Sequence, residues 1–137
     1  MAENTYMLEV VTPEKIVYRD EVQFTVVPAI DGEIGVLMNH APLVAALNIG
    51  LVRYKDSSGA EKKVAISGGF IEVIDNHGRV LAETAEHGEE IDVLRAKAAK
   101  ERAERRMAQR DESLNYVRAE QSLKRAIARL KAAGAAF

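Results

Sequence analysis

The sequence predicts a mainly β N-terminal sandwich of eight or more strands, followed by a C-terminal α-helical hairpin. In the first part of the chain, short apolar runs rich in β-branched residues alternate with turn-forming Gly, Pro, Asn and Asp residues. Between Ile91 and Gly134 there is neither proline nor glycine, and strong helix formers dominate. The net charge changes sign along the chain, so we expect two domains, residues 1–87 and residues 88–137.

The sandwich is expected from regularly spaced strand patterns. Runs such as TYMLEVV and VQFTVVPA concentrate apolar β-branched residues, and turn pairs such as Asp31-Gly32 and Gly68-Gly69 separate the runs. Many short strands with turns between them are typical of an antiparallel sandwich. The expected strands span residues 5–11, 22–29, 35–38, 43–47, 50–55, 62–67, 69–74 and 79–85.

The hairpin is expected from two helical patterns with end signals. The first helix is predicted over residues 91–108, and carboxylates at its start complement the helix dipole. They are Glu89, Glu90 and Asp92. A break follows at 109–113, where Asp111 or Ser113 is a candidate cap for a second helix that ends near residue 132. Gly134 is a typical residue just beyond a helix end.

Both helices carry narrow apolar stripes that are rich in alanine. The expected stripe residues are Leu94, Ala96, Ala99, Ala103 and Met107 in the first helix, and Tyr116, Ala119, Leu123, Ala126, Ile127 and Leu130 in the second. A buried alanine contributes only a fraction of the ~1.5–3 kcal/mol of a buried Leu or Ile. We therefore expect the hairpin to be held loosely, and a loosely held element is a candidate moving part.

The arginines of the two helices share one spacing. In each helix three arginines stand at positions i, i+7 and i+11, which lie within about 20° of one line along the helix. These are Arg95, Arg102 and Arg106 in the first helix, and Arg118, Arg125 and Arg129 in the second. If the helices fold back antiparallel, the two rows converge and leave room for an anionic ligand such as a phosphate. The alternative is a solvated surface with i,i+4 ion pairs.

Charge and motifs limit the classes of function. Residues 1–90 carry a net charge of −8 and residues 91–137 a net charge of +6, so an anion or an acidic partner is expected at the basic end. Cysteine is absent, and the three histidines lack metal-ligand spacing. No phosphate-cradling GxxxxGK[ST] loop and no catalytic constellation occurs, so we expect no enzyme. Aromatic residues make up only 5%, which argues against nucleic-acid binding.

No apolar run approaches the ~18–20 residues that span a bilayer, and the N-terminus lacks the pattern of a secretory signal. We therefore expect a non-exported chain without direct membrane insertion.

Three stretches together resemble the epsilon subunit of F-type ATP synthases. They are GEIGVLMNHAPLVAAL (32–47), VAISGGFIEV (64–73) and IDVLRAKAAKERAERR (91–106), in the order and spacing of that family. LKRAIARL near the C-terminus extends the resemblance over essentially the whole chain. Met38-Asn39 departs from the Pro-Gly that many relatives have before the histidine. The resemblance implies a mainly β N-terminal sandwich of about ten strands and a C-terminal α-helical hairpin, as the residues suggest.

The resemblance also implies a non-catalytic subunit of the central stalk. The sandwich is expected to bind the gamma subunit and the membrane rotor ring of c subunits, with Glu33 and His40 as candidate contacts. The hairpin is expected either to fold on the sandwich or to extend into the alpha/beta catalytic head, where it hinders ATP hydrolysis. The expected location is the cytoplasmic face of the plasma membrane, as a peripheral part of a proton- or sodium-translocating complex.

In a bacillus-like subset of the family, the folded hairpin binds ATP through an Ile/Leu-Asp-x-x-Arg-Ala motif. The resemblance implies ATP as a regulatory ligand here, with no metal required and no hydrolysis. The residues that match this subset are Glu86, Ile91, Asp92, Arg95, Ala96, Arg102, Arg125 and Arg129. The alternative is the same stalk subunit with a hairpin that binds only protein and has no nucleotide site.

Overall fold

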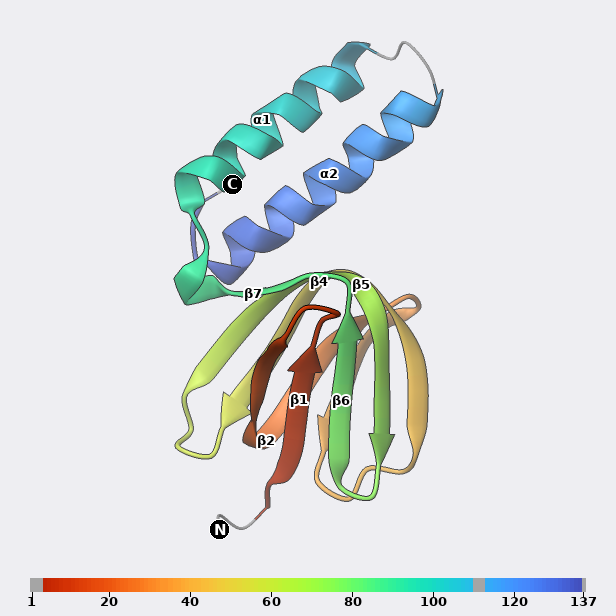
Figure 1. Cartoon of the computed structure of the whole chain (residues 1–137), viewed down its shortest axis with the longest axis vertical. Coiled ribbons are helices and arrows are strands. Elements are labelled where there is room, and N and C mark those ends of the chain that lie inside the picture. The colour runs from red at the N-terminus through yellow and green to blue at the C-terminus, as the bar shows by residue number, and fades with distance from the viewer. Residues whose placement is uncertain (1–3, 110–112, 137) are drawn as a thin grey trace.

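The computed structural model describes residues 4–109 and 113–136, and it has two parts. A barrel-like sandwich of strands carries a two-helix hairpin at one end, and the N-terminus lies at the opposite end (Figure 1). The elements are β1 (Tyr6–Val11), β2 (Ile16–Ala29), β3 (Gly32–Leu37), β4 (Leu43–Asp56), β5 (Glu61–Ile74), β6 (His77–Ala82), β7 (Ala85–His87), the 3₁₀ turn η1 (Gly88–Glu90), α1 (Val93–Gln109) and α2 (Ser113–Ala132). The predicted fold class is confirmed.

Five strands form a closed ring in the order β1-β6-β5-β4-β2, because β1 also pairs with β2. Strand β3 pairs with β2, and β7 pairs with β5. All pairs are antiparallel except β1 with β6, which is parallel and departs from the predicted antiparallel pattern. Closing the ring satisfies backbone groups that an open sheet edge would leave unpaired.

The described strands are fewer but longer than the sequence patterns predict. Strands β2, β4 and β5 each have 14 residues. The runs 43–47 and 50–55 are one continuous strand, and so are 62–67 and 69–74. The predicted turn at Gly68-Gly69 is therefore wrong: both glycines have positive φ, yet they lie inside β5. If each of the three 14-residue strands is counted once in each layer of the sandwich, the number of strands is close to the predicted ten.

The sandwich core consists of large side chains from every strand of the ring. The side chains with an exposed fraction of at most 1% include Leu8, Val27, Val52, Ile71 and Val80. Each such side chain contributes about 1.5–3 kcal/mol when removed from water. This core is a rigid platform for the residues that lie on its surface.

The hairpin docks on the sandwich through a second and smaller core. Its buried residues, among those described, are Ala65, Ile91, Ala96, Ala128, Leu130 and Ala132. Helix α2 provides the main contact with β4 and β5. Only two of these six residues are larger than alanine, and the half-buried Ile49, Leu51 and Val93 pack against them. The expectation of a loosely held hairpin stays a prediction. In the predicted stripe of α1, Ala96 and Ala103 are buried as expected, but Leu94 is placed wrongly, because it is 80% exposed.

Both ends of the hairpin have identifiable caps. The Asp92 carboxylate accepts a hydrogen bond from the Arg95 backbone N–H at 3.1 Å, which caps α1. Beyond α2, Gly134 has φ +73° and its N–H bonds the Lys131 carbonyl, while the Ala135 N–H bonds the Leu130 carbonyl. These two bonds form a Schellman motif, so the predicted role of Gly134 is confirmed. The candidate cap Asp111 and the side chain of Ser113 lie outside the described residues.

Candidate functional site

A pocket of about 350 Å³ lies between the two antiparallel helices and the adjoining strand edge. We call it the arginine pocket. Its lining residues are Thr84, Glu86, Ala99, Arg102, Ala103, Arg106, Ser122, Arg125, Ala126 and Arg129. Two arginines come from each helix, so the two predicted arginine rows do converge across the seam. Both the spacing and the antiparallel packing are needed to bring these guanidinium groups together.

Small side chains on the facing helices line the pocket between the arginines. Ala103 is 1% exposed and Ala126 is 2% exposed, so the helices pack closely at these points. Ala99 and Ser122 line the pocket beside them. The alanines therefore serve two purposes: they let the helices approach, and they keep the space between the arginine side chains unfilled.

The lining carries a strong excess of positive charge. It contains four guanidinium groups and one carboxylate, that of Glu86. Glu86 Oε1 lies 2.9 Å from Arg129 Nε, and Arg129 Nη2 donates to Glu86 Oε2 at 3.4 Å. Arg125 Nη2 donates to the Ser122 hydroxyl at 3.0 Å. One acid cannot neutralise four bases, so the pocket favours a bound anion.

Arg129 is held at the edge of the pocket by its ion pair with Glu86. Its side chain is 22% exposed, and its buried Nε lies 2.9 Å from Glu86 Oε1. This ion pair uses the one carboxylate of the lining, so the other three guanidinium groups have no acid among the lining residues.

Four of the eight predicted ATP ligands line the arginine pocket: Glu86, Arg102, Arg125 and Arg129. The other four lie near the start of α1 and are not in this lining. Ile91 is buried in the hairpin core, Ala96 is fully buried, Asp92 caps α1, and Arg95 is exposed. The assignment of all eight to one ligand stays a prediction.

Three polar residues of the lining, Thr84, Arg106 and Ser122, were not among the predicted ligands. Arg106 belongs to the predicted arginine row but has no counterpart in the family motif. Thr84 lies two residues before Glu86, so it shares the same face of an extended segment, and this alternation is the one sequence signal that could have found it. Of the two row arginines outside this lining, Arg95 is exposed near the start of α1, and Arg118 lines a neighbouring hollow of about 330 Å³ together with Arg106.

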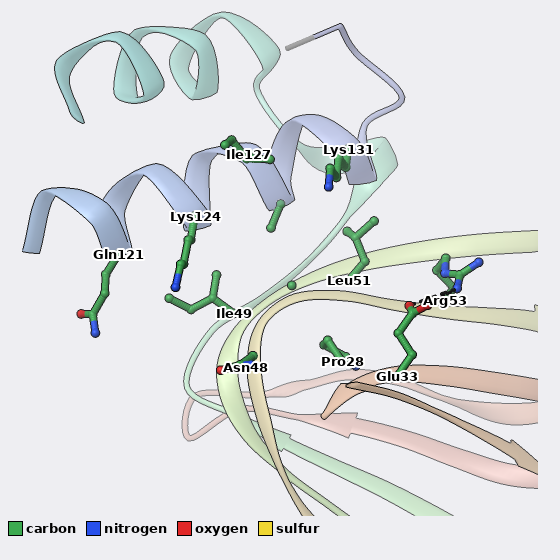
Figure 2. Close-up of a pocket in the computed structure, with 12 residues that line it drawn as sticks. Pro28, Glu33, Asn48, Ile49, Leu51, Arg53, Gln121, Lys124, Ile127 and Lys131 are labelled. Carbon is green, nitrogen blue, oxygen red and sulfur yellow. Dashed lines mark hydrogen bonds and ion pairs between the residues drawn. The ribbon is translucent and has the colours of Figure 1, made fainter. Parts of the chain in front are cut away.

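A larger groove of about 530 Å³ lies on another side of α2, over β4 (Figure 2). Lys124 extends from α2 toward the strands, and Ile49 and Leu51 of β4 face helix α2. The groove ends at an ion pair between Arg53 and Glu33, with 3.1 Å between Nη2 and Oε2. Its α2 cations are lysines, which bind anions as point charges, whereas arginine forks bind two oxygens at once. The arginine pocket is therefore the better candidate for a phosphate-containing ligand.

The two candidate partner contacts lie on the sandwich, outside the arginine pocket. Glu33 is on β3 and is held by Arg53. His40 lies between β3 and β4, where its Nδ1 is 2.7 Å from the Ala41 carbonyl oxygen. Both side chains are accessible on the surface.

The described part of the chain contains neither a metal-binding cluster nor a membrane-spanning helix. Within residues 4–109 and 113–136, no group of three or more His, Asp or Glu side chains could hold a metal ion. In the same part of the chain, no helix is both long enough and apolar enough to cross a membrane.

Two family models match the chain. Residues 5–88 match the beta-sandwich domain of the ATP synthase delta/epsilon chain, and residues 89–134 match the long alpha-helix domain of the same family. Among solved structures, a chain of the Euglena gracilis mitochondrial ATP synthase superposes with a TM-score of 0.82 at 24% identity, covering 97% of this chain and 83% of that one. A chain from the central stalk and c-ring of the Tetrahymena thermophila enzyme superposes with a TM-score of 0.59 at 12% identity, covering 96% and 98%. At these identities the likeness shows the fold alone.

Sequence relatives match over nearly the full length. An ATP synthase epsilon chain from Syntrophomonas wolfei is 69% identical over 132 residues, which is 96% of each chain. An ATP synthase epsilon chain from Desulfitobacterium hafniense strain Y51 is 52% identical over 129 residues, 94% of this chain and 96% of the relative. With both domain models matched in order, this chain belongs to the epsilon-subunit family of F-type ATP synthase, whose members are non-catalytic subunits of that complex.

Proposed function

We propose that this chain is a central-stalk subunit that couples the rotor ring to the gamma subunit and regulates ATP hydrolysis through its hairpin. The hairpin binds ATP when it is folded on the sandwich, and it extends toward the catalytic head when ATP leaves. The observation that carries the regulatory part is the arginine pocket, in which four guanidinium groups face one carboxylate.

The chemistry of the pocket fits a triphosphate. Arg102 and Arg125 are exposed at the pocket, and Arg129 adds a third guanidinium group, which is paired with Glu86. Arginine forks bind phosphate oxygens in pairs, and the bound charge relieves the repulsion between the guanidinium groups. A volume of about 350 Å³ is within the range of small-molecule sites. The set holds no general base and no metal ligand cluster, so bound ATP would be sensed and not hydrolysed.

The motif at the start of α1 would serve the nucleoside end of the ligand. A carboxylate accepts several hydrogen bonds, so the capping bond of Asp92 is compatible with a further bond to a ribose hydroxyl or the adenine amine. Ala96 is fully buried against α2, so it would contribute by letting the helices approach and not by direct side-chain contact.

ATP would act by population shift. The pocket takes walls from α1, from α2 and from the strand edge at Thr84 and Glu86, so it exists only when the hairpin is folded. A ligand shifts a two-state equilibrium only by its differential affinity, about 1.4 kcal/mol for each tenfold. When ATP falls, the basic hairpin is released to contact an acidic surface of the alpha/beta head, and this contact limits wasteful hydrolysis.

The proposed partners of the sandwich are the gamma subunit and the ring of c subunits. The proposal is supported by family membership and by the solved neighbours, whose titles describe an F1/c-ring assembly and a central stalk with its c-ring. Glu33 and His40 remain the proposed contact residues. The proposed location is the cytoplasmic face of the plasma membrane, with the chain attached through the complex.

Isothermal titration of the full chain with ATP tests the site. We expect saturable binding, and we expect Arg102→Ala or Arg125→Ala to weaken it by about 10- to 100-fold, the equivalent of a charged hydrogen bond of ~1.5–3 kcal/mol. Arg105→Ala is the matched control, because Arg105 is an exposed arginine of α1 outside the pocket lining. No heat at millimolar ATP would remove the nucleotide site and leave a hairpin that binds only protein.

A further inference from the structure

We infer that Gly88 is a positioning residue for the arginine pocket. The connection between the sandwich and the hairpin, formed by β7 and η1, is called the hinge below. Because Gly88 has no side chain, the last turn of α2 can pack against this hinge, and Arg129 can then pair with Glu86. This inference rests on the proposed nucleotide site and adds a residue that touches no ligand. Gly88 begins η1, immediately after β7 and before α1, so it occupies the connection between the sandwich and the hairpin.

The need for glycine at this position is one of space. A Cβ atom on Gly88 would lie 1.9 Å from the Ala132 carbonyl oxygen and 2.6 Å from its carbonyl carbon. Real Cβ contacts do not fall below 3.0 Å, and the obstacle is main chain, which cannot rotate away as a side chain does. The φ of Gly88 lies outside the left-handed region, so its backbone conformation is one that alanine adopts without strain. Alanine is therefore excluded only while α2 is docked.

Two contacts join the same pair of segments. Glu86 precedes Gly88 by two residues, and Arg129 precedes Ala132 by three, so the Glu86–Arg129 ion pair lies beside the close approach at Gly88. The distance between the hinge and α2 at Gly88 consequently sets the distance between the two halves of the arginine pocket. If α2 is lifted here, Arg125 and Arg129 move away from Glu86 and from α1.

The hinge itself is tied to the sandwich on both sides of Gly88. The Tyr54 hydroxyl lies 3.0 Å from His87 Nε2, and Lys62 Nζ donates to Glu89 Oε1 at 2.7 Å. Strand β7 is also paired with β5 along its three residues. Because the hinge is held, while α2 docks through a core composed mostly of alanines, a side chain at position 88 would displace α2 rather than the hinge.

The size of the displacement can be bounded. Relieving a contact of 1.9 Å to the shortest real value of 3.0 Å requires a shift of about 1 Å, and binding constellations hold their geometry only within about 0.5 Å. Gly88→Ala should therefore lower the population of the docked hairpin, and apparent ligand affinity falls in proportion to that population.

The test compares Gly88→Ala with Gly35→Ala in the full chain. Gly35 lies in β3, and a Cβ atom added to it would meet nothing within 4 Å, so its substitution is the matched control. We expect Gly88→Ala to weaken ATP binding in titration calorimetry by at least about tenfold. We also expect faster hydrogen exchange of the amides of α2, with unchanged exchange in the strands of the sandwich. Gly35→Ala should change neither measurement.

The outcomes separate this inference from the nucleotide site itself. Wild-type ATP affinity and wild-type α2 exchange in Gly88→Ala would overturn the role of Gly88. Faster exchange in the sandwich as well would also overturn it, because the effect would then be general destabilisation. If the unmodified chain binds no ATP but Gly88→Ala still speeds exchange of α2 alone, the nucleotide proposal fails while the positioning of α2 by Gly88 stands.

Discussion

The sandwich buries large aliphatic side chains on every strand of a closed ring, whereas the hairpin is held mainly by alanines. In the sandwich, Leu8, Val52 and Ile71 are almost fully buried, and each strand of the ring pairs with two neighbours. In the hairpin core, Ile91 and Leu130 are the only buried residues larger than alanine among those described. We therefore expect the hairpin to leave the surface at a smaller cost in free energy than unfolding of the sandwich.

The largest effect is expected in the sandwich core. Leu8→Ala removes a fully buried side chain and should lower the free energy of unfolding by about 2–5 kcal/mol, because the rigid ring collapses only partly around the cavity. Leu81→Ala is the control, since Leu81 is 44% exposed on β6. Urea unfolding followed by circular dichroism measures both. Equal loss of stability in the two variants would contradict the account of a tightly packed sandwich core.

The same substitution in the hairpin should give a different kind of effect. Leu130→Ala removes the one fully buried leucine of the hairpin core, among the described residues, so α2 should undock before the sandwich unfolds. We expect faster amide exchange throughout α2 and a change in sandwich stability of less than about 1 kcal/mol. Leu94→Ala, at a residue that is 80% exposed on α1, should change neither quantity. If Leu130→Ala instead lowers sandwich stability as much as Leu8→Ala, the two parts form one cooperative unit.

The smallest effect is expected at the hinge and depends on pH. The hydrogen bond and charge of Lys62 lower the pKa of Glu89 in the folded chain. This carboxylate therefore favours the folded hinge above its unfolded pKa of about 4.3, and the contribution is lost as pH falls through the lower folded pKa. We expect the protection of the Ile91 amide, which bonds the Gly88 carbonyl, to decline in that acidic window.

Two lysine variants isolate this contact. Lys62→Gln should remove the acid-dependent step in Ile91 protection, whereas Lys63→Gln should keep it, because Glu89 is paired with Lys62. Both groups are exposed, so the step should be small. An identical pH profile in the two variants would show that the ion pair does not hold the hinge.

Sequence reasoning found the elements that depend on local patterns. The two helices, the Gly134 cap and the arginine rows follow from local sequence patterns, and the structure has both helices, the cap and four of the six row arginines in one pocket lining. Sequence reasoning failed where contacts between distant segments determine strand pairing and backbone conformation. The parallel pairing of β1 with β6 joins segments far apart in the chain, and Gly68-Gly69 looks like a turn until the neighbouring strands are in place.

The candidate site shows the same division. Arg102, Arg125 and Arg129 were found by their spacing and by the family motif, but the contribution of Thr84 depends on where the strand edge meets the helices. Gly88 carries no pattern that marks it as special, because its importance comes from a carbonyl 44 residues later in the chain. Local signals identify the candidate binding groups, and only the packed structure shows what brings them together.

Hydrogen exchange of α2 with and without ATP tests the central claim most directly. Amides that exchange by undocking of the hairpin should slow by about 100-fold when ATP is present at one hundred times its dissociation constant, equivalent to ~2.7 kcal/mol. The strands of the sandwich should exchange at the same rate in both conditions, and Arg102→Ala should reduce the slowing to about 2- to 11-fold at the same ATP concentration. Equal exchange of α2 with and without saturating ATP would contradict the account, because ATP would then have no preference for the folded hairpin.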